Sequence, residues 1–261
     1  MGHFVVEAGH SGIEVTPTHF RKCEIVARHA VARVGLPAIV KPISETGSTG
    51  VTLVETETVA IQALRNLLGA TADVRGRRIH PGALLMSYIA GDEFSVEIFD
   101  SRVFGVRRKH LGALPHFVEI GHDAPAIMSP QLRPQMVDEA LRATEVPGHR
   151  RGPAHVELRA HQGCVTIIEV NPRPAGGSIP SVFLHATGFD PVLAVLRSLL
   201  GMPPEAPTAG AYGSIRFIVP EHEGHFQIHQ NCERLVGRSA HRIRFISALP
   251  TEFRRYNDFR D

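Results

Sequence analysis

Apolar residues in the first part of the chain recur with the spacings of two helices and a strand between them. Residues 23–34 place apolar side chains three and four positions apart and end at Gly35, which is typical of a helix C-terminus. Residues 58–68 repeat the pattern and end at Gly69. The short apolar run LPAIVKP between them is typical of a buried strand. We therefore predict the order strand, helix, strand, loop, strand, helix for residues 11–69.

Alternating and helical patterns continue after a polar stretch, residues 71–82, which we interpret as a hinge. The helix at 191–200 has Asp190 as N-cap and Pro191 in its first turn. The other predicted elements are strands at 84–89, 93–99, 102–109, 154–159, 164–170 and 212–219, and a helix at 131–145. Helices mixed with antiparallel hairpins predict the α+β class.

Composition excludes several protein classes. The 261 residues are 43% hydrophobic and 21% charged, which is a globular composition with enough apolar residues for a sizeable core. Three cysteines without a CxxC pair favour a reducing compartment and argue against a zinc knuckle. The chain shows no signal peptide and no apolar run of about 18 residues. We therefore expect a cytoplasmic protein with no membrane partner.

The charge distribution does not favour a nucleic-acid surface. The net charge is +2, the charges are spread along the chain, and aromatic residues make up 6%. Of 28 basic residues only Lys22, Lys41 and Lys109 are lysines. Where arginine dominates, a lysine can mark a site that needs a compact ammonium.

The first candidate site is Lys41 followed by the glycine-containing loop SETGSTGV, residues 44–51. Such a loop can present backbone N–H groups to an anion while the ammonium approaches from the side. This arrangement suits a polyphosphate, although it is not a Walker P-loop. A polar turn with a solvated lysine is an equally weighted alternative.

The second candidate is DEFSVEIF, residues 92–99. Alternation places Glu93, Ser95 and Glu97 on one face of this strand. Their carboxylates could accept hydrogen bonds from sugar hydroxyls or contact a cation. Taken alone, the segment is better explained as an ordinary half-exposed strand.

The third candidate is the hairpin AHVELRAHQGCVTIIEVNPRPAGG, residues 154–177. A turn centred on residues 161–163 would put residue 157 opposite about 167 and residue 155 opposite about 169. Glu157, Glu169 and Asn171 then share one face, and these oxygen ligands suit Mg²⁺ or Mn²⁺. Arg173 has the same parity and could clamp a phosphate or carboxylate. We favour this metal site over the alternative of solvated surface acids.

In this order, the three sites resemble the ATP-grasp superfamily, in particular its carboxylate-amine ligase branch. The resemblance covers about residues 13–220 and includes HFVEIGHDAPA, which is similar to a segment of amino-acid ligases. It implies an ATP-grasp fold with a small subdomain (1–82), a large subdomain (83–205) and an atypical C-terminal segment (206–261) packing on the large one. It implies nucleotide-binding roles for Lys41, Ser44, Gly47, Ser48, Gly50, Ser87, Ile89, Glu93 and Lys109. It also implies that Glu157, Glu169 and Asn171 bind the metal ion, and it gives catalytic roles to Lys41, on the ATP phosphates, and to Arg173, on the transferred phosphoryl group or the acyl phosphate.

The implied activity is an ATP- and Mg²⁺-dependent (or Mn²⁺-dependent) ligase that joins a small-molecule carboxylate to an amine through an acyl phosphate, on amino-acid-like substrates. Backbone groups of Ser87 and Ile89 would meet the adenine, Glu93 the ribose, and Glu119 with His122 could line the substrate pocket. The chain has Met86 where members usually carry Glu, and the usual N-terminal domain is not visible. Two alternatives stay open: an ATP-binding remnant without ligase turnover, and a superfamily enzyme with another nucleophile. A homodimer or a companion chain that supplies the missing domain is a further open expectation.

Overall fold

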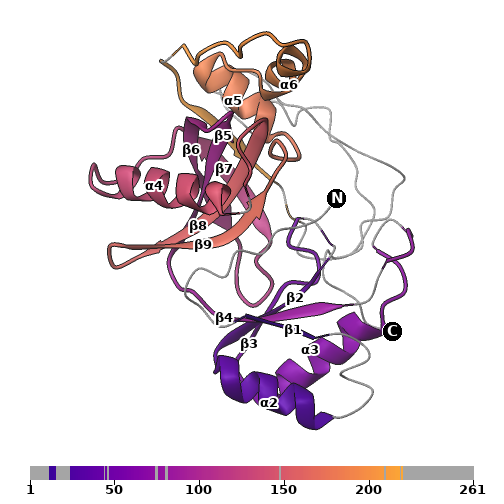
Figure 1. Ribbon diagram of the computed structural model, residues 1–261. Helices are drawn as coiled ribbons and strands as arrows, with labels where there is room; N and C mark the ends of the chain where they lie inside the picture. Colours follow the sequence, from indigo (N-terminus) through magenta and orange to yellow (C-terminus); the bar gives the residue numbers. More distant parts are fainter. Residues whose placement is uncertain are drawn as a thin grey trace, which may run out of the picture. The chain divides into compact units, whose positions relative to one another are not determined.

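The computed structural model describes residues 12–15, 24–43, 45, 47–73, 76–79, 82–146, 148–208, 210–217 and 219. The chain divides into two compact units, Met1–Phe217 and Ile218–Asp261. Two antiparallel sheets with flanking helices form the described part of the first unit (Figure 1). The α+β class is confirmed. Most of the predicted C-terminal segment 206–261 lies outside the described residues, so its packing stays a prediction.

The smaller sheet has the strand order β1-β4-β2-β3. Its strands are β1 (Gly12–Val15), β2 (Ala38–Pro42), β3 (Thr52–Val54) and β4 (Ala83–Ser87). Helices α2 (Glu24–Val34) and α3 (Glu57–Gly69) cover one face (Figure 1). Val40, Leu85 and Leu64 are fully buried between sheet and helices. This core fixes β2 and therefore the position of Lys41 near its end.

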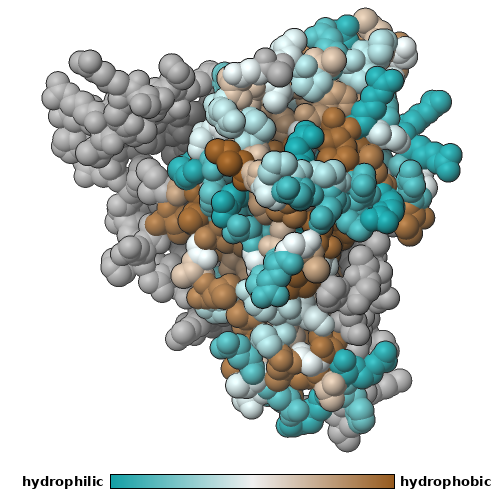
Figure 2. All heavy atoms as spheres, turned by 90° about the vertical axis from the view of Figure 1, so that its left-hand side faces the viewer, coloured by the Kyte–Doolittle hydropathy of each residue, from teal (hydrophilic) through white to brown (hydrophobic). Residues whose placement is uncertain are grey.

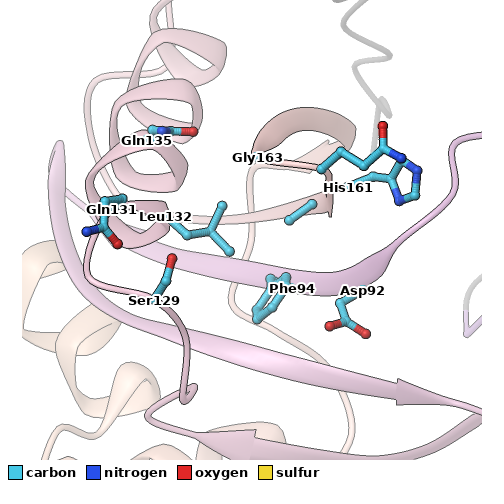
Figure 3. A pocket seen from close by; sticks show the side chains of 10 residues that line it. Asp92, Phe94, Ser129, Gln131, Leu132, Gln135, His161 and Gly163 are labelled. Atoms are coloured by element: carbon cyan, nitrogen blue, oxygen red, sulfur yellow. The ribbon is translucent and has the colours of Figure 1, made fainter.

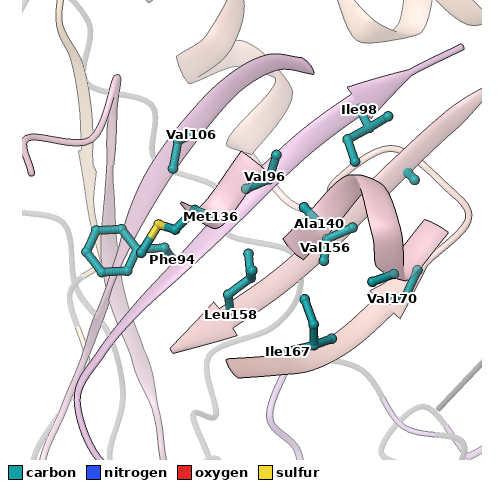
Figure 4. Packing of buried hydrophobic residues seen from close by; sticks show 12 residues of the cluster. Phe94, Val96, Ile98, Val106, Met136, Ala140, Val156, Leu158, Ile167 and Val170 are labelled. Atoms are coloured by element: carbon teal, nitrogen blue, oxygen red, sulfur yellow. The ribbon is translucent and has the colours of Figure 1, made fainter. Parts of the chain in front are cut away.

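The larger sheet has the strand order β10-β7-β6-β5-β8-β9. Its strands are β5 (Asp92–Phe99), β6 (Arg102–Leu111), β7 (Glu119–Ala124), β8 (Pro153–His161), β9 (Cys164–Asn171) and β10 (Gly213–Arg216). Phe94, Val96 and Ile98 of β5 pack in a core with Met136 and Ala140 of helix α4 (Leu132–Glu145) (Figure 4). The predicted alternation on β5 is therefore confirmed, and Glu93, Ser95 and Glu97 point to the opposite face.

Helix α5 (Ile179–Thr187) packs at one end of that polar face. A Cβ on Gly105 of β6 would lie 2.4 Å from Cε1 of Phe183, so only glycine allows α5 to approach this closely. Helix α6 (Pro191–Leu199) follows, and its N-cap Asp190 accepts hydrogen bonds from the backbone N–H groups of Val192 and Leu193. The N-cap prediction is confirmed.

The β8–β9 hairpin differs in register from the predicted one. Gln162 and Gly163 form a two-residue turn, both with positive φ, between the pair His161 and Cys164. A bulge between Glu157 and Leu158 shifts the register once more. Glu157 therefore lies directly opposite Glu169, and His155 opposite Asn171. The predicted partners, 167 and 169, were wrong by two residues, but the predicted shared face holds.

The sequence patterns did not predict two elements, β7 and α5. Strand β7 contains Gly121 and two acids, which are rare in strands. Helix α5 is a short, largely apolar segment of nine residues, and periodicity alone does not assign such a segment to a helix or a strand. The polar stretch 71–82 includes a bridge between Ala72 and Arg78, and its role as a hinge stays a prediction.

Among the described residues, no single helix is long and apolar enough to cross a membrane. Helices α5 and α6 together are long and apolar enough for a membrane span, but they bend by 92° at their junction. On the face drawn in Figure 2, hydrophilic and hydrophobic side chains are interspersed.

Candidate active site

A cavity of about 150 Å³ within the first unit is lined by residues of both sheets. The predicted site residues that line it are Lys41, Gly47, Ser48, Ser87, Ile89, Glu93, Lys109, Glu157, Glu169 and Arg173. Segments up to 132 positions apart in sequence, from Lys41 to Arg173, thus meet at one place. The lysine of the first sequence motif lies next to the acidic hairpin of the third.

Three predicted site residues are not among the lining residues. Ser44 lies outside the described residues. Gly50 has a positive φ of 72° and packs near Leu67 and Pro42, so its part is to shape the loop. Asn171 is 1% exposed and its Nδ2 has no hydrogen-bond partner among the described residues.

Lys41 and Glu169 form the contact between the two sheets at this site. The Lys41 Nζ donates to Oε2 of Glu169 over 3.2 Å. Both side chains are partly buried. Lys41 lies near the end of β2, and β9 carries Glu169 on its polar face. An ammonium and a carboxylate are therefore available at the same point of the cavity.

Lys109 occupies the centre of the polar face with three carboxylates around it. Its Nζ lies 2.8 Å from Oε1 of Glu93, 3.0 Å from Oε1 of Glu119 and 3.1 Å from Oε2 of Glu157. Burial alone would lower the pKa of Lys109, but these carboxylates outweigh it and raise the pKa well above its ordinary value. Lys109 is therefore a permanent cation.

Arg159 was not singled out from the sequence, yet it engages the residues predicted to meet the nucleoside. Its Nε and Nη2 donate to Oε2 of Glu93 over 3.0 and 2.8 Å, and its Nη1 donates to the carbonyl of Ile89 over 2.5 Å. The guanidinium also lies over the rings of Tyr88 and Phe117. Both oxygens of Glu93 thus have partners already, so a ribose hydroxyl would have to use their remaining lone pairs.

His155 bridges two carboxylates on the same face. Its Nδ1 lies 2.7 Å from Oε1 of Glu97, and its Nε2 lies 3.0 Å from Oε1 of Glu157. Burial alone would lower the pKa of His155, but the carboxylates raise it to about 9, so both ring nitrogens donate at neutral pH. For Glu97, burial would raise the pKa, but His155 and the Arg107 guanidinium lower it to about 2. No single motif shows this bridge, because it joins β5 to β8.

Glu119 lines the cavity, and His122 lies behind it. The Nε2 of His122 is 3.5 Å from Oε2 of Glu119, which is longer than an ordinary hydrogen bond. Burial is the main reason that the pKa of His122 is lowered, so its ring is neutral at pH 7. Of the two residues expected to line the substrate pocket, Glu119 lines this cavity and His122 is not among its lining residues, and a role of either in substrate binding stays a prediction.

A second cavity, of about 230 Å³, lies on the other face of β5 (Figure 3). Asp92 and Phe94 line it together with Ser129, Gln131, Leu132 and Gln135 and the turn at His161. Its described lining contains no lysine or arginine, so it offers no such cation for a phosphate group. The cavity of about 150 Å³ that is lined by both sheets, hereafter the smaller cavity, is therefore the better candidate for binding a phosphorylated ligand.

The charges around the smaller cavity fit a divalent cation together with a phosphorylated ligand. Among the described residues, the lining carries five glutamates but four cationic side chains, Lys41, Lys109, Arg159 and Arg173. This balance alone disfavours a triphosphate, and a cation held by carboxylates would reverse it. No group of three or more His, Cys, Asp and Glu side chains converges on a metal position in the described part of the chain. Glu157 and Glu169, which lie directly opposite each other across the hairpin, are two carboxylates that could hold such a cation.

Comparison with known proteins decides the family. The family model of the ATP-grasp domain matches residues 34–181, which is more than half of the chain and includes every residue of the site from Lys41 to Arg173. The chain belongs to the ATP-grasp family. The ATP-grasp fold and the predicted resemblance are thereby confirmed.

Relatives of this ATP-grasp chain include ligases. Carnosine synthase 1 from Homo sapiens is 31% identical over 197 residues, which cover 71% of this chain and 24% of that protein. The crystal structure of L-amino acid ligase from Bacillus licheniformis has a TM-score of 0.67 at 22% identity, covering 88% of this chain and 56% of that one. The biotin carboxylase domain of 2-oxoglutarate carboxylase from Hydrogenobacter thermophilus, in complex with MgADP, has a TM-score of 0.60 at 18% identity, covering 78% and 50%. The ATP-grasp chain thus spans about a quarter to a half of the length of these proteins.

Proposed function

We propose that the chain carries the ATP-binding and phosphoryl-transfer site of an ATP-dependent carboxylate-amine ligase acting on amino-acid-like substrates. The observation that carries this proposal is the contact of Lys41 with Glu169, because it brings strand β2 with its lysine and the acidic hairpin to one cavity. The similarity to carnosine synthase 1 and to L-amino acid ligase, together with the FVEIGH segment, supports the proposal of amino-acid-like substrates.

In the proposed reaction, a carboxylate oxygen of the first substrate attacks the γ-phosphorus of ATP. The bond from that phosphorus to the bridging oxygen breaks, and ADP leaves. The amine nitrogen of the second substrate then attacks the acyl carbon and loses a proton, while the bond to phosphate breaks. The carboxylate must first be phosphorylated, because the oxygen of a free carboxylate is a poor leaving group whereas phosphate is a good one.

The residues of the chain contribute position and charge in this proposal. Lys41 would hold the phosphates from β2, and Arg173 would bind the transferred phosphoryl group. Ser48 and Gly47 would bring their loop over the phosphates and exclude water. Glu157 and Glu169, with Asn171 behind them, would hold Mg²⁺ or Mn²⁺, which supplies neutralisation of phosphate charge when bound.

The test is ADP formation by the full chain, screened over pairs of amino acids with and without the amine partner. The native chain should form ADP in an amine-dependent manner, and Glu169→Gln should lose at least about 100-fold in turnover. Glu139→Gln on α4, whose side chain pairs with Arg142 at the surface, is the matched control. ATP binding without amine-dependent ADP formation would favour the alternative of a nucleotide-binding remnant.

A further inference from the structure

The polar face of the larger sheet carries a row of side chains with alternating charge. The row runs Arg107, Glu97, His155, Glu157, Lys109, Glu93, Arg159, and neighbouring members approach within 2.7 to 3.1 Å. Its members come from β5, β6 and β8, so the row crosses three adjacent strands. Its cationic members are nearly buried: the side chain of Arg107 is 1% exposed and that of His155 is 7% exposed.

Glu157 lies in the middle of this row, and both of its oxygens are held. Oε1 faces Nε2 of His155 at 3.0 Å, and Oε2 accepts from Nζ of Lys109 at 3.1 Å. Two donors on opposite oxygens fix the rotation of the carboxylate. The remaining lone pairs then have a defined direction in the cavity that Glu157 lines.

His155 is fixed in turn from its other side. Oε1 of Glu97 is 2.7 Å from Nδ1 of His155, and the same carboxylate accepts from Nη2 of Arg107 over 2.7 Å. The imidazole therefore cannot rotate without losing both of its carboxylate contacts. His155 itself is not among the residues that line the cavity. It acts on the site through Glu157.

We propose that His155 is a positioning residue that holds the Glu157 carboxylate in the orientation required to bind the divalent cation. The proposal rests on the proposed function, in which Glu157 is a metal ligand. Carboxylates that bind metal ions are commonly oriented by hydrogen bonds from a second layer of residues, and loss of such a partner typically weakens metal binding by about 10- to 100-fold.

Two substitutions of the same residue separate the two contacts of the ring. In His155→Asn the amide reaches the place of Nδ1, so the contact to Glu97 can persist while the contact to Glu157 is lost. In His155→Gln the longer side chain brings its amide nitrogen to the place of Nε2, so a donor to Glu157 is kept. Because both variants remove the imidazole, a difference between them reports on Glu157 and not on the general loss of the ring.

The measurement is Mn²⁺ affinity, read by electron paramagnetic resonance on the full chain with a non-hydrolysable ATP analogue. We expect His155→Asn to bind Mn²⁺ about 10- to 100-fold more weakly and His155→Gln to stay within about threefold of the native chain. The apparent Mg²⁺ activation constant of ADP formation should change in parallel. His110→Asn is the matched control, because His110 pairs with Asp123 on the same sheet, with 2.6 Å between Nε2 and Oδ2, and is not a member of the row.

Equal Mn²⁺ affinities of His155→Asn and His155→Gln would overturn the proposal. If His155→Asn does not fold, Glu97→Asp is the second variant: it keeps the charge but withdraws the carboxylate from Nδ1, and unchanged Mn²⁺ affinity would then count against the positioning role. Glu157→Gln separates the proposed metal-binding role of Glu157 from the proposed positioning role of His155. Unchanged Mn²⁺ affinity in Glu157→Gln would refute the metal role of Glu157 itself, whereas weakened binding there and native binding in His155→Asn would refute only the part played by His155.

Discussion

At the scale of single residues, alternation along strands was enough to predict part of the site from the sequence. Glu157, Glu169 and Glu93 could be placed on one face because side chains in a strand point to opposite sides in turn. Arg159 and His155 could not be singled out, because their partners lie on β5, a strand about 60 positions away. The partners of a charged side chain in one strand can be identified only when the neighbouring strand and its register are known.

Glu97 provides a prediction about acid stability. Its pKa is about 2 in the folded chain against an ordinary value of 4.5, so its ionised form stabilises the fold above pH 4.5. This stabilisation is lost as the pH falls through about 2. We expect Glu97→Gln to lower the free energy of unfolding by roughly 3 kcal/mol at pH 7, since it leaves Arg107 and His155 with less compensation. The difference from the native chain should shrink between pH 4.5 and pH 2 in urea titrations.

Glu139→Gln serves as the control for this experiment too. Its partner Arg142 is exposed, so we expect a change within about 0.5 kcal/mol at every pH. A difference between Glu97→Gln and the native chain that stays constant from pH 7 to pH 2 would contradict the lowered pKa.

At the scale of elements, amphipathic helices and alternating strands were predicted close to their observed bounds. α4 was expected at 131–145 and runs from Leu132 to Glu145. The register of the β8–β9 hairpin could not be predicted from the sequence, because neither the two-residue turn at Gln162 and Gly163 nor the bulge at Glu157 follows from apolar alternation. The bulge matters for the proposed metal site, because it sets Glu157 directly opposite Glu169.

The approach of α5 to β6 gives a prediction about packing. A methyl group at Gly105 would lie 2.4 Å from a ring carbon of Phe183, so Gly105→Ala must displace α5. We expect a loss of about 1–3 kcal/mol, measured as a lower urea midpoint at an unchanged slope. Gly69→Ala at the end of α3 is the matched control, because no atom of the described residues lies within 4 Å of the place its methyl group would take. The control should be neutral or stabilised by up to about 1 kcal/mol, and equal losses in both variants would show that Phe183 does not limit the site at Gly105.

At the scale of the whole molecule, side chains from both sheets meet at one cavity. The smaller sheet brings Lys41, the larger one brings four carboxylates together with Lys109 and Arg159, and Arg173 follows the end of β9. Because glutamates outnumber cationic side chains by five to four in the described lining, nucleotide and divalent cation should bind as a pair.

This pairing predicts how nucleotide changes the thermal stability of the full chain. A ligand at about 100 times its dissociation constant stabilises a fold by about 2.7 kcal/mol, which corresponds to roughly 5–10 °C for a unit of this size. We expect MgATP to raise the melting temperature by that amount, and ATP with EDTA to raise it much less, because the carboxylates then face the phosphates without a cation between them. Lys41→Gln should reduce the MgATP effect, whereas His110→Asn should leave it unchanged. An equal rise with and without EDTA would mean that the carboxylate pair of the hairpin does not meet the phosphates through a metal ion.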